Sequence, residues 1–195
     1  MDLKEKYARE GLTFKKLQKG ISGTGSNYGA YRIDAEFSLN DPSKVPDLAF
    51  IEFSINDNHQ GFSAANSRKY METIARKLYK ANPNMDVVFL YTTQISRLDN
   101  IDTWITAHKA VADRYGITQI NVGKALIDHI RAHEDYVSDE VTFAGSETNK
   151  NYSDLWLTYM SDYVHPSDNG YQVYSDAIME VLNSEWSKEV PESQT

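Results

Sequence analysis

The sequence contains no cysteine in its 195 residues, which excludes a disulfide framework, a thiolate metal site and a cysteine nucleophile. It has no apolar run near the roughly 18 residues that a membrane span requires, so no span is expected. Residues 1–6 alternate in charge and lead into no apolar segment, unlike a secretory signal peptide. A cytoplasmic location is expected if the chain begins at its natural start, and the compartment stays open otherwise.

Positive charge is also scarce. The chain has 20 Lys and Arg against 28 Asp and Glu, a formal net charge of -8 and a sequence pI near 5.1. A net-acidic surface repels phosphate backbones unless a local basic stripe overrides it. The basic stretch at Lys15, Lys16 and Lys19 is short and is balanced by acidic residues from Asp34 onward. Nucleic acid is therefore not expected as a partner.

The composition is that of one globular domain, with 41% hydrophobic and 12% aromatic residues. We expect the domain to span residues 1–187 and a polar, frayed tail to span residues 188–195. Apolar runs alternate with amphipathic stretches, which is typical of an α/β domain with a parallel sheet and helices on both faces. The expected strands are residues 48–53, 87–91 and 117–122, and the expected helices are residues 63–81, 101–115, from about 124, and 167–186.

Three segments give weaker signals. Residues 12–14 begin like a strand but lead into lysines, which favours an edge strand. Residues 27–37 fit both a helix face and a strand alternation, each with Tyr31 pointing inward. A helix is favoured there because the segment follows a glycine-rich loop. Residues 134–160 show no clean period, which indicates an inserted, lid-like region.

In an open parallel sheet, ligands bind beyond the carboxyl ends of the strands, and three segments with polar residues are expected there. Asp162 and His165 are three residues apart, so the carboxylate can fix the tautomer of a general base; the alternative is a simple turn. Asn56 offers a neutral amide for an oxyanion, or else stabilises a turn. Gly23, in the glycine-rich stretch 20–25, allows a backbone N–H to approach a ligand, or lies in a flexible loop.

Two further patterns offer alternatives. Gly23 and Gly25 with Gly29 resemble a dinucleotide-binding loop, but the preceding stretch is too polar for the central strand that such a loop follows. His129 and His133 lie four residues apart on an expected helix, either as a metal-binding face or as a solvated helix end.

Some residues have no role that the sequence alone assigns. His59 and His108 have no convincing partner. An aromatic group near the Asp162–His165 segment lines an acyl or sugar pocket, or else forms a plain core cluster. Its members are Tyr152, Trp156, Tyr159 and Tyr163.

Taken together and in this order, the motifs GISGTGS, SIND and DYVHP resemble those of the SGNH hydrolases, also called the GDSL esterase and lipase family. The resemblance covers residues 12–182. It implies a three-layer α/β/α, flavodoxin-like fold and a serine ester hydrolase that acts on a small-molecule ester without a metal or organic cofactor. It also implies that Asp162 and His165 belong to a Ser-His-Asp triad, and that Gly23 and Asn56 form the oxyanion hole.

The chain departs from the family pattern in two places. Ser54 stands where the family usually has glycine, which puts a Cβ near the oxyanion loop. The Gly-Asp-Ser block, which in the family bears the nucleophilic serine at the end of the first strand, occurs nowhere in the sequence. Ser22 is a weak candidate for a substitute, because it approaches the Gly-x-Ser-x-Gly nucleophile elbow but has Thr24 in place of the last glycine.

The absent block has a structural and a functional consequence. The resemblance places the missing first strand between the segment at 12–14 and the strand at 48–53. Unpaired strand edges would result, which predicts a destabilised, gapped or re-paired sheet and self-association through those edges. The alternative function is a catalytically dead fragment or pseudo-hydrolase that acts as a binding module, and the serine itself separates the two.

Overall fold

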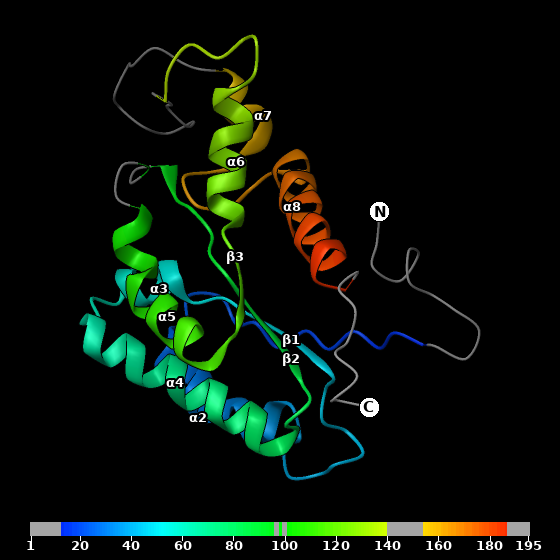
Figure 1. The fold of residues 1–195 in the computed structure, drawn as a ribbon. Coiled ribbons are helices and arrows are strands. Elements are labelled where there is room, and N and C mark those ends of the chain that lie inside the picture. Colours follow the sequence, from blue (N-terminus) through cyan, green and yellow to red (C-terminus); the bar gives the residue numbers. More distant parts are fainter. Residues whose placement is uncertain (1–12, 96–97, 99–100, 140–153, 187–195) are drawn as a thin grey trace. The chain divides into compact units, whose positions relative to one another are not determined.

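The computed structural model describes residues 13–95, 98, 101–139 and 154–186. The chain forms two compact units, one of Gln18–Lys124 and the other of Met1–Leu17 together with Ala125–Thr195. Figure 1 shows the elements along the chain. Within the described ranges, every helix is too short or too polar to span a bilayer.

The unit Gln18–Lys124 is built on a parallel sheet. Its strands are β1 (Leu48–Ile51), β2 (Asp86–Leu90) and β3 (Thr118–Ile120), in the order β1-β2-β3. In register, Leu48 pairs with Asp86, and Val88 pairs with Thr118. The strands coincide with the apolar runs of the sequence, which confirms the predicted α/β fold with a parallel sheet.

Three helices share the hydrophobic core of this sheet: α2 (Ser26–Glu36), α4 (Ala64–Ala81) and α5 (Ile101–Tyr115). Ser63 caps α4, because its side chain accepts the backbone N–H of Asn66 at 3.3 Å. Each fully buried aliphatic side chain contributes about 1.5–3 kcal/mol relative to an exposed one. The core includes Ala49, Ile51, Val87 and Phe89 from the sheet and Ile33, Met71, Ile74, Leu78 and Val111 from the helices.

The helix predicted within residues 27–37 is confirmed, but its expected inward face is wrong. Tyr31 is 83% exposed, whereas Ala30 and Ile33 are buried. The alternative for this segment, a strand with Tyr31 facing inward, is excluded because the backbone is helical. The small Ala30 and the branched Ile33 lie one turn apart on the side of α2 that packs on α4.

The edge of the sheet differs from the prediction. Thr13 and Phe14 do not form a strand, so the expected edge strand does not exist there. Ala49 and Ile51 are buried, but Phe50 is 38% exposed, so β1 is not buried on both faces. Among the described residues β1 pairs only with β2, and self-association through its other edge stays a prediction.

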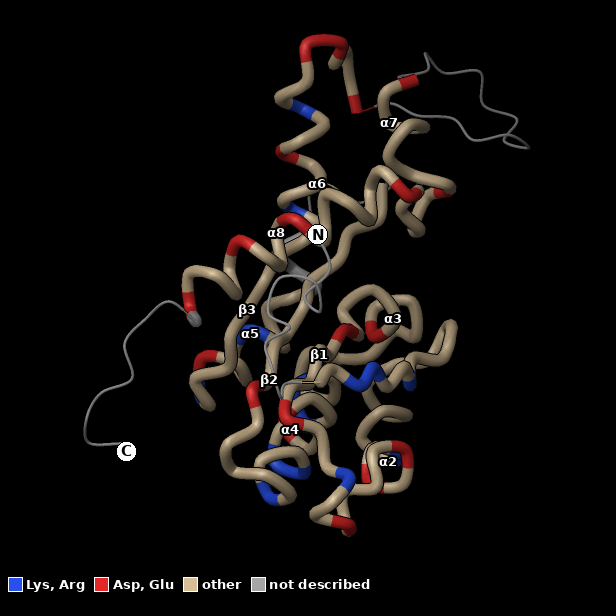
Figure 2. Tube along the Cα trace, turned by 90° about the vertical axis from the view of Figure 1, so that its right-hand side faces the viewer, with Lys and Arg blue, Asp and Glu red and all other residues tan. Residues whose placement is uncertain are grey.

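The outer side of α4 is basic. Figure 2 shows Lys and Arg along this helix. Arg68, Lys69, Arg76 and Lys80 are exposed, while the side that carries Ile74 and its apolar neighbours is buried. Residues three and four apart share one face of a helix, so these side chains form a cationic surface. The net charge of -8 for the whole chain gives no sign of this local surface.

The second unit contains most of α6 (Val122–Arg131), and all of α7 (Asp154–Tyr159) and α8 (Asp168–Trp186). The helix α7 lies within residues 134–160, and the expectation that this stretch is an inserted, lid-like region stays a prediction. The rest of that stretch, residues 140–153, lies outside the described residues.

The helix α8 confirms the last predicted helix. The pattern Tyr171, Tyr174, Ile178 and Leu182 predicts an inward face for this helix. Tyr174 and Leu182 are buried in agreement with it, but Tyr171 is 53% exposed, so its predicted inward position is wrong. The hydroxyl of Ser167 accepts the backbone N–H of Gly170 at 3.4 Å, as expected of an N-cap.

Candidate active site

Asp162 and His165 lie in the loop between α7 and α8 and contact each other directly. Asp162 Oδ2 and His165 Nδ1 are 2.7 Å apart, and Asp162 Oδ1 accepts the backbone N–H groups of Val164 and His165, each at 2.7 Å. The carboxylate is an acceptor, so Nδ1 carries a proton, and in the neutral ring Nε2 is then the acceptor. One carboxylate therefore closes the turn and orients the ring, which makes the two expected roles of Asp162 compatible.

The Asp162 carboxyl is ionised at neutral pH. Burial acts to raise its pKa, but hydrogen bonds from the His165 and Val164 backbone and from the His165 ring outweigh burial and hold the pKa of Asp162 below its usual range. A carboxylate in contact with Nδ1 stabilises an imidazole that has gained a proton at Nε2.

The loop that carries this pair is closed at its base. Met160 and Pro166 form an antiparallel bridge. Inside the bridge, the Ser161 N–H donates to the His165 carbonyl at 2.8 Å. The two ends of the loop that carries His165 are therefore held together by backbone hydrogen bonds.

The contact between α7 and α8 requires glycine at position 170. A Cβ added to Gly170 would lie 2.1 Å from the Tyr159 carbonyl oxygen and 2.8 Å from the Pro166 side chain. That same carbonyl accepts the Ser167 N–H at 2.9 Å. The start of α8 is thus fixed against the end of α7, next to the His165 loop.

Gly23 lies in a hydrogen-bonded turn that leads into α2. Its φ of +71° is in the left-handed region that favours glycine. The hydroxyl of Thr24 donates to the Ile21 carbonyl at 2.8 Å, and Gln60 Nε2 donates to the Gly23 carbonyl at 2.9 Å. The Gly23 N–H donates to no other group in the described part of the chain, so it is available to a ligand.

Asn56 lies on a short helix, α3 (Ser54–His59), that begins just after β1. The interpretation of Asn56 as a turn-stabilising residue is wrong, because its backbone is helical. Its side-chain amide is half-buried and forms no hydrogen bond with the described residues. Gln60, which holds the Gly23 carbonyl, follows Asn56 by one helical turn. The loop of Gly23 is thus anchored to the end of the helix that carries Asn56.

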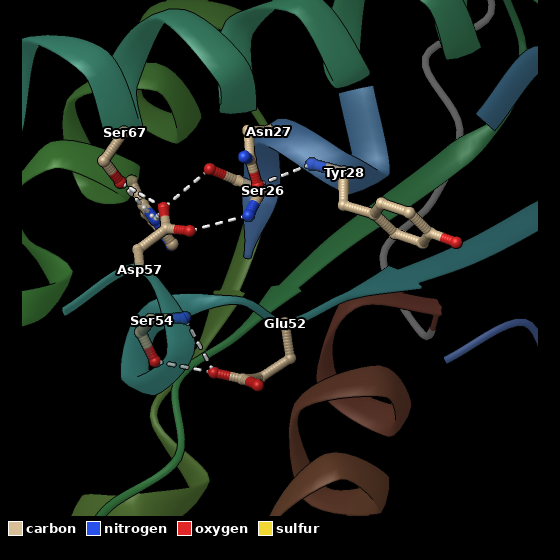
Figure 3. A network of polar contacts seen from close by, with 8 residues as sticks. Ser26, Asn27, Tyr28, Glu52, Ser54, Asp57 and Ser67 are labelled. Atoms are coloured by element: carbon tan, nitrogen blue, oxygen red, sulfur yellow. Dashed lines mark hydrogen bonds and ion pairs between the residues drawn. The ribbon is translucent and has the colours of Figure 1, made fainter. Parts of the chain in front are cut away.

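Ser54 occupies the position where a glycine was expected. Its backbone N–H and its hydroxyl both donate to Glu52 Oε1, at 2.9 Å and 2.7 Å (Figure 3). The side chain is buried. The extra Cβ is accommodated because the hydroxyl it carries bonds Glu52.

A second Asp–His pair, which the sequence did not reveal, lies in the unit Gln18–Lys124. His108 Nε2 is 3.0 Å from Asp57 Oδ2 and 2.8 Å from Ser67 Oγ. All three residues are buried, so the expectation that His108 lacks a partner is wrong. A signal existed, because both His108 and Ser67 lie on the apolar faces of their predicted helices, and a buried polar group needs a partner.

The other histidines also have local partners. His59 Nε2 is 2.8 Å from Gln94 Oε1, so the expectation that it lacks a partner is wrong as well. His129 Nε2 is 3.0 Å from the Tyr159 hydroxyl, and His133 Nδ1 accepts the Asp135 N–H at 3.2 Å. In the described ranges no cluster of three or more acidic or His side chains could hold a metal ion. The metal-binding face at positions 129 and 133 stays an untested alternative.

The glycine-rich loop does not have the setting of a dinucleotide site. Residues 13–20 are not a strand, so Gly23 and Gly25 do not follow one, and that interpretation is wrong. Ser22 is exposed in the same turn, in the unit Gln18–Lys124, while the Asp162–His165 pair lies in the other unit. Its role as a nucleophile stays a prediction.

The aromatic group near His165 is divided in its environment. Trp156 is fully buried, and its indole N–H donates to the Ser138 carbonyl at 3.2 Å, so it is a core residue. Tyr163 is partly exposed, whereas Tyr159 is half-buried. Tyr152 lies outside the described residues.

Residues 2–173 match the model of the GDSL-like Lipase/Acylhydrolase family. No curated protein sequence matches the chain.

Solved structures show the same fold. A two-domain esterase active on acetylated mannans has a TM-score of 0.62 and 21% identity, over 89% of this chain and 39% of that one. A lipase/acylhydrolase from Enterococcus faecalis has a TM-score of 0.57 and 16% identity, over 84% of this chain and 72% of that one. An acetylxylan esterase from Geobacillus stearothermophilus, as a catalytic mutant with serine replaced by alanine, has a TM-score of 0.58 and 16% identity, over 88% and 74%. The chain spans less than half of the first of these proteins.

Proposed function

The chain belongs to the GDSL-like lipase/acylhydrolase family, and from this premise we propose that it is an SGNH-type hydrolase of small acyl esters. His165 is the general base, Asp162 orients it, and Gly23 and Asn56 stabilise the oxyanion. One observation carries the proposal: His165 Nδ1 is bonded to Asp162 at 2.7 Å while the ring is 65% exposed, so a substrate has access to Nε2.

The proposed reaction follows from these atoms. A serine hydroxyl attacks the ester carbonyl as His165 Nε2 takes its proton, and the Asp162 carboxylate stabilises the imidazolium. The Gly23 N–H and the Asn56 Nδ2 stabilise the tetrahedral oxyanion, and both groups are free of other partners in the described part of the chain. His165 then protonates the leaving alcohol, and water releases the acid from the acyl-enzyme by the same steps.

The proposed reaction requires a serine nucleophile. The printed sequence contains no Gly-Asp-Ser, and Ser22 is the serine of this chain that we propose to test first. Its exposed position next to Gly23 leaves the hydroxyl accessible to a reagent.

We propose an acetyl ester of a carbohydrate as the substrate class. Structural neighbours include an esterase active on acetylated mannans and an acetylxylan esterase. The partly exposed Tyr163, two residues before His165, offers an aromatic face on which a sugar ring can stack.

The test is labelling of the chain with a fluorophosphonate, followed by mass spectrometry of the adduct, together with hydrolysis of 4-nitrophenyl acetate. We expect an adduct on one serine and ester hydrolysis, both lost in His165→Ala. The matched control is His133→Ala, because His133 is also a solvent-accessible histidine with an aspartate, Asp135, at 3.6 Å. It is expected to keep both activities.

A second candidate function rests on the absence of Gly-Asp-Ser from the sequence. In this alternative the chain is a pseudo-hydrolase that binds an ester without cleaving it. No adduct and no hydrolysis, with binding of an acetylated xylo-oligosaccharide retained, would favour this alternative over the hydrolase. An adduct that survives His165→Ala would contradict the assignment of the general base.

A further inference from the structure

Asp57 lies at the centre of a buried polar cluster that joins four helices. Its carboxylate accepts the backbone N–H of Ser26 at 2.6 Å and the hydroxyl of Ser26 at 2.7 Å. It also accepts the Ser67 hydroxyl in a short hydrogen bond and His108 Nε2 at 3.0 Å. Ser26 begins α2, Asp57 lies on α3 and Ser67 lies on α4 (Figure 3). His108 lies on α5.

The protons in this cluster can be assigned from the acceptors. The Ser67 hydroxyl donates to Asp57, so its oxygen is free to accept from His108 Nε2 at 2.8 Å. His108 Nε2 therefore carries a proton, which it shares between Ser67 and Asp57. The opposite ring nitrogen, Nδ1, is buried without a hydrogen-bond partner in the described part of the chain.

The carboxylate is ionised inside this cluster. Burial acts to raise its pKa, but hydrogen bonds from His108, from the Ser26 backbone and from the Ser67 and Ser26 hydroxyls outweigh burial and hold the pKa of Asp57 below its usual range. An anion at the first N–H groups of α2 also replaces a side-chain cap, which Gly25 at the N-cap position cannot provide.

The cluster is connected to the loop of Gly23. A Cβ on Gly25 would lie 3.0 Å from Asp57 Oδ1 and 2.9 Å from Gln60 Oε1, so the chain runs directly against α3 at this point. Gln60 Nε2 holds the Gly23 carbonyl at 2.9 Å. Asn56 is adjacent to Asp57 on the same helix. The Asp57 carboxylate is therefore connected through Gly25 and Gln60 to the Gly23 loop, and through the backbone of α3 to Asn56.

We propose that Ser67 and His108 are positioning residues that fix, through Asp57, the geometry of Gly23 and Asn56. The proposal rests on the proposed function, since it gives these two groups the role of oxyanion donors. An oxyanion hole depends on donors held in place before charge develops, and a carboxylate fixed from four helices supplies such rigidity. Apolar side chains at positions 67 and 108 would fill the same space without fixing the carboxylate.

The test compares three variants of the full chain. Ser67→Ala removes one donor to Asp57, and His108→Leu removes another. His108→Gln is the conservative variant, because its amide N–H can replace Nε2–H. The matched control is Tyr115→Phe, which deletes the hydrogen bond from Tyr115 on α5 to Glu72 on α4, 3.0 Å long, and so loosens the same helix pair without touching Asp57.

Two NMR readouts are measured on each variant. The first is amide hydrogen exchange at Ser26, whose N–H bonds Asp57. The second is titration with dimethylphosphinate, a tetrahedral anion that mimics the oxyanion, followed at the Gly23 N–H and the Asn56 Nδ2 groups. We expect Ser67→Ala and His108→Leu to speed exchange at Ser26 and to weaken dimethylphosphinate binding, each by roughly tenfold, as for the loss of one buried hydrogen bond. His108→Gln and Tyr115→Phe are expected to remain near the wild type.

Each other outcome decides a separate point. If Ser67→Ala and His108→Leu bind dimethylphosphinate as tightly as the wild type, the positioning role is overturned, even where exchange at Ser26 is faster. If Tyr115→Phe weakens binding equally, the effect is general loosening and the proposal is overturned as well. If the wild type shows no shift at Gly23 or Asn56, the oxyanion assignment fails. In that case, unchanged exchange at Ser26 in Ser67→Ala and His108→Leu would also overturn the role of the cluster in ordering the Gly23 loop, whereas faster exchange would support that role. Should His108→Leu fail to fold, Ser67→Ala decides.

Discussion

Two Asp–His pairs in this molecule use the same groups in opposite settings. Asp57 and His108 come from different helices, and their side chains are 4% and 0% exposed. Asp162 and His165 are three residues apart in one loop, and their side chains are 52% and 65% exposed. The buried pair meets through Nε2 and leaves Nδ1 enclosed, whereas the exposed pair meets through Nδ1 and leaves Nε2 on a ring that is exposed to solvent.

The difference is consistent with the roles that we propose for the two pairs, chemistry for the exposed one and structure for the buried one. A substrate needs access to an unprotonated ring nitrogen, and only the exposed pair offers one. A buried carboxylate needs several donors, and the pair at Asp57 has them from Ser26, Ser67 and His108. Spacing in the sequence identified the local pair, but only the tertiary structure reveals the other.

The largest expected effect is that of Asp57→Ala on stability. The variant leaves the Ser26 N–H, the Ser67 hydroxyl and His108 Nε2 without their shared acceptor. We expect a loss of about 3–5 kcal/mol in the free energy of unfolding, because each buried donor left without an acceptor costs about 1–3 kcal/mol. Urea unfolding followed by circular dichroism measures it, and a loss below about 1 kcal/mol, the size typical of an exposed pair, would contradict the distinction.

A smaller loss is expected from Gly25→Ala, which crowds the buried pair without removing any donor. The added methyl group would lie 2.9–3.0 Å from Gln60, Asp57 and Phe62. We expect a loss of about 1–3 kcal/mol, as for overpacking. The control is Gly20→Ala, where an added Cβ meets nothing within 4 Å. Equal urea midpoints for the two variants would mean that the loop does not pack tightly on α3.

The loss of stability in acid should be a further difference between the two pairs. The pKa of Asp57 is lowered by folding, so the stability it contributes is fully present above the unfolded-state pKa, near 4, and is lost as pH falls through the lower folded-state value. We expect urea midpoints to decrease below about pH 4. The urea midpoint of Asp57→Asn, which has no carboxyl group at this position, should decrease less with falling pH than that of the wild type. The midpoint of Asp162→Asn should keep more of the wild-type decrease, because the contacts of Asp162 are local. Identical slopes for the two variants would count against the buried pair as the main acid-sensitive contact.

The smallest change in stability is expected from Asp162→Ala. Contacts between solvent-exposed side chains contribute little, so the free energy of unfolding should change by less than about 1 kcal/mol. The ring of His165 should nevertheless respond, because its Nδ1 loses the acceptor that fixed the proton there. Long-range ¹H–¹⁵N NMR of the imidazole should show a shift toward the Nε2–H tautomer, and an unchanged tautomer would mean that Asp162 does not orient His165.

Much of the fold could be predicted from the sequence, because short apolar runs and helical periodicity report on burial. The strands at Leu48–Ile51 and Asp86–Leu90 and the helix at Ala64–Ala81 are of this kind. The errors fall where burial depends on tertiary neighbours. Phe50 is as apolar as the core residues beside it but is partly exposed, and Tyr31 is exposed although two periods placed it inward.

The site could be predicted where its contacts are local. Asp162 and His165 are close in sequence, and their contact follows from one turn. Asp57 and His108 are 51 residues apart, so their contact depends on how α3 and α5 pack. The position of His108 on an apolar helix face still gave a clue, since a buried imidazole requires a hydrogen-bond partner.

The closed base of the His165 loop has a consequence for entropy. The bridge between Met160 and Pro166 and the bond from Ser161 to the His165 carbonyl exist without a ligand. The conformational freedom of the loop is thus given up once, during folding, rather than each time a substrate binds. Binding at this loop should therefore show a small entropic penalty. An insertion between positions 161 and 166 should restore the conformational disorder that the bridge and the Ser161 hydrogen bond remove.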